Sequence, residues 1–133
     1  MIAIVCIDDN YGMIFNNRRQ SRDSILIQNV LEITKDTKLW ISSYSSSLFP
    51  YEDNIIIDDE FLLKATVGEY CFVEKENLEP FEDKIEKIVV YKWNCTYPYD
   101  KVFDIDLDKW NLLNSSDFSG KSHEKITMEV YSK

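Results

Sequence analysis

The sequence predicts an α/β fold, a three-layer arrangement of a central mixed β-sheet, a few short helices and a C-terminal antiparallel hairpin. Short β-branched runs alternate with amphipathic stretches up to residue 93, a pattern that places helices against a sheet. Beyond residue 110 the helical pattern stops and two strand-like segments remain. The chain has 133 residues, 44% of them hydrophobic, so we expect one domain over residues 1–133.

The first half of the chain alternates strand and helix signals. Residues 2–7 (IAIVCI) form a continuous apolar run, which is typical of a strand buried on both faces of a sheet. The polar stretch 16–23 (NNRRQSRD) predicts a loop, after which Asp23 or Ser24 caps a helix with apolar residues at helical spacing. The elements expected next are a strand, a serine-rich loop or weak helix start, and another strand, at 39–41, 42–47 and 54–57.

The second half repeats these short signals before its character changes. Two short helices and two strands are expected to alternate, over 58–65, 70–73, 78–86 and 87–93. Residues 110–113 and 126–131 predict the two arms of a long antiparallel hairpin. Polar and apolar residues alternate along the second arm, which is the period of two expected of a half-buried edge strand.

The charge balance excludes several classes of partner. Fifteen Lys and Arg against 24 Asp and Glu give a formal charge of −9. Because so acidic a surface repels phosphate groups, we expect no bulk nucleic-acid binding and no membrane binding. The opening MIAIVCIDDN has no basic leader and only a short apolar run, so the expected location is cytoplasmic.

No metal or cofactor site is indicated by the sequence pattern. Cys6, Cys71 and Cys95 show no CxxC or Cys/His spacing and lie in apolar or aromatic stretches, so buried, reduced thiols are expected. The acid-rich stretches have no glycine-centred calcium loop and are expected to be solvated rims at turns and strand ends.

The order of these elements resembles dihydrofolate reductase across nearly the whole chain. IAIVCIDDNYG (2–12) is similar to that family's first strand, acidic turn and the glycine that opens its active-site loop. The segments that follow in the family's order are TKDTKLWI (34–41), NIII (54–57), GEYCFV (68–73) and KIVVYKW (87–93). KVFDIDLDKWNLL (101–113) and SHEKITMEVY (122–131) resemble its closing strands. The resemblance implies a reductase-type fold.

The same resemblance implies that reductase chemistry has been lost. The family's first helix carries a carboxylate that helps to protonate the pterin, and apolar Leu26, which cannot donate a proton, stands in its place. Tyr91 replaces the threonine that braces this carboxylate. Glu74-Lys75-Glu76 replaces the glycine-rich turn that holds the cofactor pyrophosphate, and two carboxylates repel a diphosphate. We therefore expect no cofactor and no NADPH-dependent folate reduction.

A second resemblance is to short bacterial proteins labelled ribonuclease Z. It covers IVCIDDNYGMIFNNRRQSRD (4–23), GEYCFVE (68–74), IEKIVVYKWN (85–94) and SHEKITMEVY (122–131). The enzyme of that label is a two-zinc hydrolase built around an HxHxDH motif. The chain has a single histidine, His123, and so cannot form that site.

Two polar segments carry the candidate functional residues. Arg18, Arg19 and Arg22 lie within five residues in an otherwise acidic chain. They are either solvated side chains paired with carboxylates or an anion clamp, since guanidinium groups match phosphate and carboxylate geometry.

The second segment is the turn that holds Ser122, His123 and Lys125, which the reductase resemblance places beside the arginine loop. His123 is either a hydrogen-bonding or capping residue, a phosphate contact, or a general base. Ser21, Ser122 and Asp23 allow several arrangements with it, but no GxSxG motif is present.

The preferred hypothesis is a non-catalytic or repurposed reductase-fold protein that binds a small anionic ligand or a protein partner. Its anion site would be formed by Arg18, Arg19, Arg22, Ser122, His123 and Lys125. The first alternative is an enzyme acting on a phosphorylated or nucleotide substrate, with His123 as base and the three arginines as clamp. The second is a structural interaction module, for example a homodimer formed through an exposed strand edge.

Overall fold

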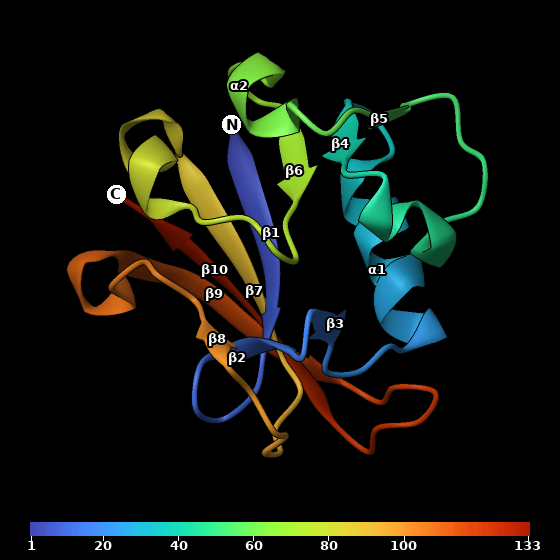
Figure 1. The fold of residues 1–133 in the computed structure, drawn as a ribbon, viewed down its shortest axis with the longest axis vertical. Coiled ribbons are helices and arrows are strands. Elements are labelled where there is room, and N and C mark those ends of the chain that lie inside the picture. Colours follow the sequence, from blue (N-terminus) through green and yellow to red (C-terminus); the bar gives the residue numbers. More distant parts are fainter.

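A computed structural model describes residues 1–133 and contains one seven-stranded mixed sheet (Figure 1). Its strands are β1 (Ile2–Ile7), β4 (Leu39–Ile41), β5 (Ile55–Ile57), β6 (Tyr70–Phe72), β7 (Lys87–Lys92), β9 (Asn111–Phe118) and β10 (Ile126–Ser132). They lie in the order β5-β4-β6-β1-β7-β10-β9. Strands β5 to β7 in this order run parallel, whereas β10 runs antiparallel to both β7 and β9. The expected mixed sheet with an antiparallel C-terminal pair is confirmed.

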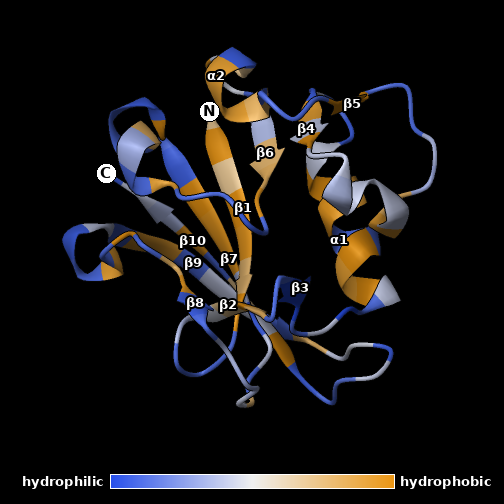
Figure 2. Cartoon of the chain, in the orientation of Figure 1, coloured by the Kyte–Doolittle hydropathy of each residue, from blue (hydrophilic) through white to orange (hydrophobic).

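Alternate residues of β1 feed two separate hydrophobic cores, one on each face of the sheet. Ala3 and Val5 pack into the cluster that contains Phe61, whereas Ile2 and Ile4 pack into the cluster around the first helix. Figure 2 shows β1 as an apolar strand through the middle of the sheet. A strand covered on both faces needs an unbroken apolar run, which is the pattern of residues 2–7.

Five short helices or turns of helix supply the covering layers. They are α1 (Ser24–Thr34), α2 (Phe61–Lys64) and the 3₁₀ helices η1 (Tyr44–Leu48), η2 (Glu79–Lys84) and η3 (Leu107–Lys109). Helix α1 begins at its N-cap Asp23, whose backbone is extended and whose side chain accepts hydrogen bonds from the backbone N–H groups of Ile25 and Leu26. At the other end, the Asn54 amide donates to the Thr34 carbonyl and satisfies one of the last helical acceptors. No helix has the length and apolar character needed to cross a membrane.

The polar stretch 16–23 was expected to be a loop, but part of it forms a short strand. Asn16 and Asn17 have positive φ angles of 54° and 63°, which is the conformation of a tight hairpin turn that asparagine tolerates. The turn joins β2 (Gly12–Phe15) to β3 (Arg18–Arg19), and β8 (Lys101–Val102) completes a second, three-stranded sheet. Arg18 and Arg19 form a strand because they pair with β2. Their polar sequence alone does not indicate this partner.

The position of the last strand also differs from expectation. Strand β10 is not an edge strand, because it lies between β7 and β9, and β9 forms the edge. The alternation along β10 reflects two differently covered faces and carries no information about how many neighbours the strand has. The long hairpin itself, β9 with β10, is present as expected.

Candidate functional site

The carboxylate of Asp23 joins the two polar segments that the sequence analysis singled out. It accepts hydrogen bonds from the backbone N–H groups of Lys121 and Ser122 at 2.8 and 2.9 Å, in addition to its bond from Ile25 at 2.9 Å. His123 Nδ1 lies 2.9 Å from Asp23 Oδ2, the oxygen that also accepts from Ser122. Asp23 therefore fastens the start of α1 to the 120–123 turn, about 100 residues away in the chain.

These bonds also fix the charge of Asp23. Burial by itself raises the pKa of a carboxyl group, but the hydrogen bonds from Lys121, His123, Ser122 and Ile25 outweigh it, and the pKa of Asp23 lies well below its ordinary value. The group is therefore an anion at neutral pH although only 3% of the residue is exposed. A buried anion that already accepts from four backbone N–H groups can also hold an imidazole in one orientation.

His123 is held on three sides. Its ring stacks on Trp93 with the centroids 4.5 Å apart, and its Nε2 lies 3.1 Å from Ser21 Oγ and 2.9 Å from the Tyr97 hydroxyl oxygen. Because the Asp23 carboxylate only accepts, Nδ1 carries the proton toward it, and Nε2 is left as the acceptor. The arrangement leaves one basic nitrogen facing Ser21 and Tyr97.

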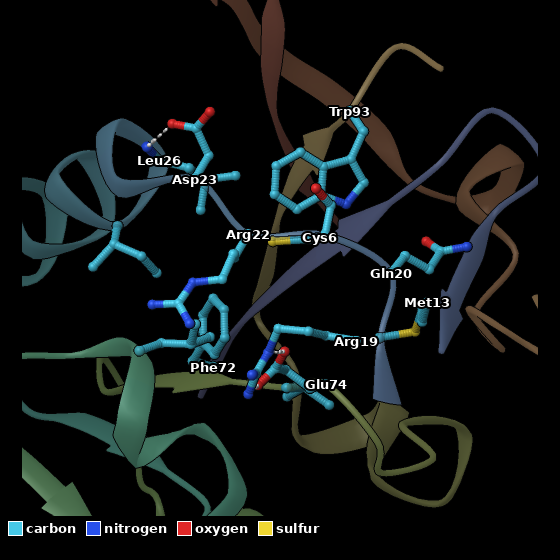
Figure 3. Close-up of a pocket in the computed structure, with 14 residues that line it drawn as sticks. Cys6, Met13, Arg19, Gln20, Arg22, Asp23, Leu26, Phe72, Glu74 and Trp93 are labelled. Atoms are coloured by element: carbon cyan, nitrogen blue, oxygen red, sulfur yellow. Dashed lines mark hydrogen bonds and ion pairs between the residues drawn. The ribbon is translucent and has the colours of Figure 1, made fainter. Parts of the chain in front are cut away.

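Ser21 also lines a narrow cavity at the centre of the molecule (Figure 3). The walls come from β1, β2, the 18–23 segment, α1, the end of η1, and the ends of β6 and β7 with the residues that follow them. They include Cys6, Met13, Leu26, Phe72, Val73 and Trp93. Space for a water-sized molecule amounts to about 20 Å³, which holds about one water. The side chains nearly fill this cavity in the present conformation.

Arg19 closes one side of the cavity through a pair with Glu74. Its Nε and Nη2 lie 2.8 and 3.0 Å from the two carboxylate oxygens (Figure 3). Its guanidinium stacks over Tyr44 at 4.4 Å. Ser45 Oγ donates to the same carboxylate at 2.7 Å. Because the fork of Arg19 is engaged with Glu74, it is not available to a ligand in this conformation.

The six residues proposed as one anion site lie over several surfaces. Arg22 and Ser122 share a groove beside the start of α1, and His123 contacts Ser21 as described above. Arg18 faces a different hollow, formed with Phe15 and Pro98, and Lys125 is exposed with its Nζ 3.8 Å from Asp117. Lys121, which lines the groove with Arg22, is not among the site residues predicted from the sequence. Its signal, a lysine next to Ser122, is too common to stand out.

The three cysteines and the acidic residues form no metal site. No group of three or more His, Cys, Asp or Glu side chains is arranged to hold a metal ion. Cys6, Cys71 and Cys95 are free thiols, of which Cys71 is buried and the other two are half-buried. Burial raises the pKa of the Cys71 thiol to about 12, so this group stays protonated at neutral pH.

No protein-family model matches the chain, and no curated protein matches it in sequence. Among solved structures, it is similar to dihydrofolate reductase from Enterococcus faecalis, complexed with NADP(H) and RAB-propyl. The TM-score is 0.62 and the identity is 12%, and the match covers 98% of this chain and 94% of the reductase. The chain has a dihydrofolate reductase-like fold. At this identity the likeness shows the fold and carries no information on activity.

Leu26, Tyr91 and Glu74, which the resemblance places at reductase positions, are all engaged in contacts within the protein. Leu26 is 1% exposed and packs in one apolar cluster with Tyr91, whose hydroxyl donates to the Asn29 side chain. Glu74, where the resemblance implies a pyrophosphate cradle, is bound by Arg19 and Ser45. Residues 74–76 do not fit a diphosphate, because they contain no glycine and the carboxylate of Glu74 would repel its negative charge.

Proposed function

We propose that the chain is a reductase-fold protein repurposed to bind a small anionic ligand in the groove between the start of α1 and the 120–123 turn. The observation that carries the proposal is the pairing of two cationic side chains, Arg22 and Lys121, on this groove. Both are exposed, and neither has a carboxylate within ion-pair distance. Two exposed cations without a carboxylate partner on one groove favour an anion there, although the chain as a whole is acidic.

The groove supports a ligand of defined chemistry. Its open volume is about 430 Å³, within the range of small-molecule sites. Ser24 and Ser122 line it with the two cations, and its apolar lining comes from Ile27, Leu31, Leu48 and Pro50. A ligand with a carboxylate or phosphate group attached to an apolar or aromatic group would contact both the cations and the apolar side chains of the groove.

A thermal-shift screen tests this function. Inorganic phosphate, nucleotides, folates, NADPH and aromatic carboxylates would be compared, so that phosphate and carboxylate ligands are distinguished. A ligand at one hundred times its Kd stabilises a protein by about 2.7 kcal/mol, which is a shift of about 10 °C for a chain of this size. The shift should be lost in Arg22→Ala and Lys121→Ala, and retained in Arg18→Ala, the matched variant outside the groove. No stabilising ligand, or equal loss in all three variants, would refute the proposal.

A second candidate function is self-association through β9. This edge strand exposes seven of its eight residues, including Leu112 and Leu113 at 53% and 55%. An exposed edge strand offers unpaired backbone groups to a second copy of the chain. Light scattering would show a dimer that Leu113→Lys dissociates, whereas a monomer at all accessible concentrations would exclude it.

A further inference from the structure

Three side chains near the cavity form a hydrogen-bonded relay, of which only Asp23 also lines the anion groove. Ser21 Oγ lies 3.1 Å from His123 Nε2, and His123 Nδ1 lies 2.9 Å from Asp23 Oδ2. A hydroxyl, an imidazole and a buried carboxylate in this order are the arrangement that activates serine as a nucleophile on several unrelated folds. The arrangement is recognised by its geometry, since it has no fixed order in the sequence.

We infer that Ser21 is a nucleophile toward short-chain carboxylic esters, with His123 as its general base and Asp23 as the residue that positions the imidazole. This inference goes beyond the proposed anion binding and does not depend on it. A ligand in the groove and an acyl group on Ser21 involve different contacts.

The surroundings of the relay favour this role over that of a solvated polar cluster. The side chain of His123 is 8% exposed and that of Asp23 is fully buried, so water competes little for their hydrogen bonds. Trp93 stacks against the ring and prevents it from turning away. A base held by a carboxylate on one nitrogen and facing a hydroxyl with the other is preorganised for proton transfer.

Tyr97 lies within hydrogen-bonding distance of both His123 and Ser21. Its hydroxyl oxygen lies 2.9 Å from His123 Nε2 and 3.3 Å from Ser21 Oγ. Burial raises the pKa of Tyr97, so it remains a neutral phenol that donates a hydrogen bond and does not remove a proton. His123 is therefore the base beside Ser21.

The backbone beside Ser21 offers donors for the developing oxyanion. The N–H groups of Ser21 and Arg22 donate no hydrogen bond within the protein. In serine hydrolases the N–H of the residue after the nucleophile commonly stabilises the oxyanion, and here that residue is Arg22.

The proposed reaction requires only an ester and water. Ser21 Oγ forms a bond to the acyl carbon as its proton passes to His123 Nε2, and the ester C–O bond breaks as the leaving alkoxide takes that proton. Water then attacks the acyl-Ser21 carbonyl, gives its proton to Nε2, and the carboxylic acid leaves as Oγ is reprotonated. The cavity that Ser21 lines has space for about one water-sized group, so acetate esters, whose acyl methyl group is of about that size, are the expected substrates.

The test is covalent labelling of the full chain with a fluorophosphonate, located by peptide mass spectrometry. We expect one adduct on Ser21, absent from Ser21→Ala and from unfolded protein, and retained in Ser115→Ala, the matched variant of an exposed serine on β9. His123→Gln should slow labelling by about 100-fold or more, the usual contribution of a general base. Tyr97→Phe should keep the adduct. The folded protein should hydrolyse 4-nitrophenyl acetate faster than the octanoate.

The positioning role of Asp23 has its own readout. In folded Asp23→Asn, labelling of Ser21 should slow by about 100-fold or more, because the imidazole is no longer held with Nε2 as the acceptor, and Asp23→Glu should restore part of the rate. An unchanged labelling rate in Asp23→Asn would remove Asp23 from the relay. No adduct on folded protein, an adduct on Tyr97, or labelling that is indifferent to His123→Gln would overturn the inference, whatever the result of the ligand screen.

Discussion

Replacing Asp23 by Asn tests whether this one carboxylate holds the two halves of the site together. Asparagine is as good an N-cap as aspartate, so α1 should keep its start. On the side of Oδ2, however, an amide N–H₂ would face the Ser122 N–H, while the bonds from Lys121 and Ile25 lose a charged acceptor. An unsatisfied buried donor costs about 1–3 kcal/mol, and hydrogen bonds to a charged group are stronger than neutral ones, so the expected loss is about 3 kcal/mol.

The loss should depend on pH in a defined direction. The pKa of folded Asp23 lies below its unfolded value of about 3.9, so the ionised carboxylate stabilises the protein above about pH 4. As the pH falls below that value toward the folded pKa, this stabilisation is lost. The difference between wild type and Asp23→Asn should thus be largest near neutral pH and shrink at about pH 3.

Urea unfolding followed by tryptophan fluorescence measures this difference directly. Asp23→Ala serves as a comparison, because it also loses the N-cap and should cost about 1 kcal/mol more. A difference below about 1 kcal/mol between wild type and Asp23→Asn at neutral pH, or one of equal size at about pH 3, would refute the reasoning.

Three other substitutions test separate parts of the structure. Gly12→Ala would place its Cβ 2.8 Å from Tyr99 Cβ and 2.6 Å from Gln20 Nε2, so a loss of about 1–3 kcal/mol in urea unfolding is expected, and a neutral result would contradict this packing. Glu74→Gln removes the charged partner of Arg19 and should lower the free energy of unfolding by about 1–3 kcal/mol, and an unchanged urea midpoint would contradict this pairing. Leu26→Ala should lower the free energy of unfolding by about 2–5 kcal/mol and enlarge the cavity. Hydrolysis of esters with a longer acyl chain should then be faster than in the wild type.

Much of the architecture could be predicted from local patterns. The run IAIVCI is apolar without interruption because β1 is buried on both faces, and Asp23 followed by a periodic apolar stretch marks a helix start because capping is a local interaction. The resemblance to dihydrofolate reductase gave the element order, and the fold comparison agrees with it.

Other features depended on neighbours that a local pattern does not specify. Arg18 and Arg19 form a strand only because β2 pairs with them, and β10 is internal only because β9 lies beside it. Arg19, chosen as part of an anion clamp, is bound to Glu74, 55 residues away. Spacing within one loop cannot show which carboxylate from another element neutralises an arginine.

The candidate site divides along the same line. The sequence by itself determined the residue types, an arginine-rich segment, a single histidine and the absence of a proton donor at Leu26, because composition is independent of folding. Only the tertiary structure decided that Asp23 accepts from Lys121 and Ser122 and thereby places His123 against Ser21. These contacts join positions about 100 residues apart, and their geometry follows from how the sheet brings the last turn beside the start of α1.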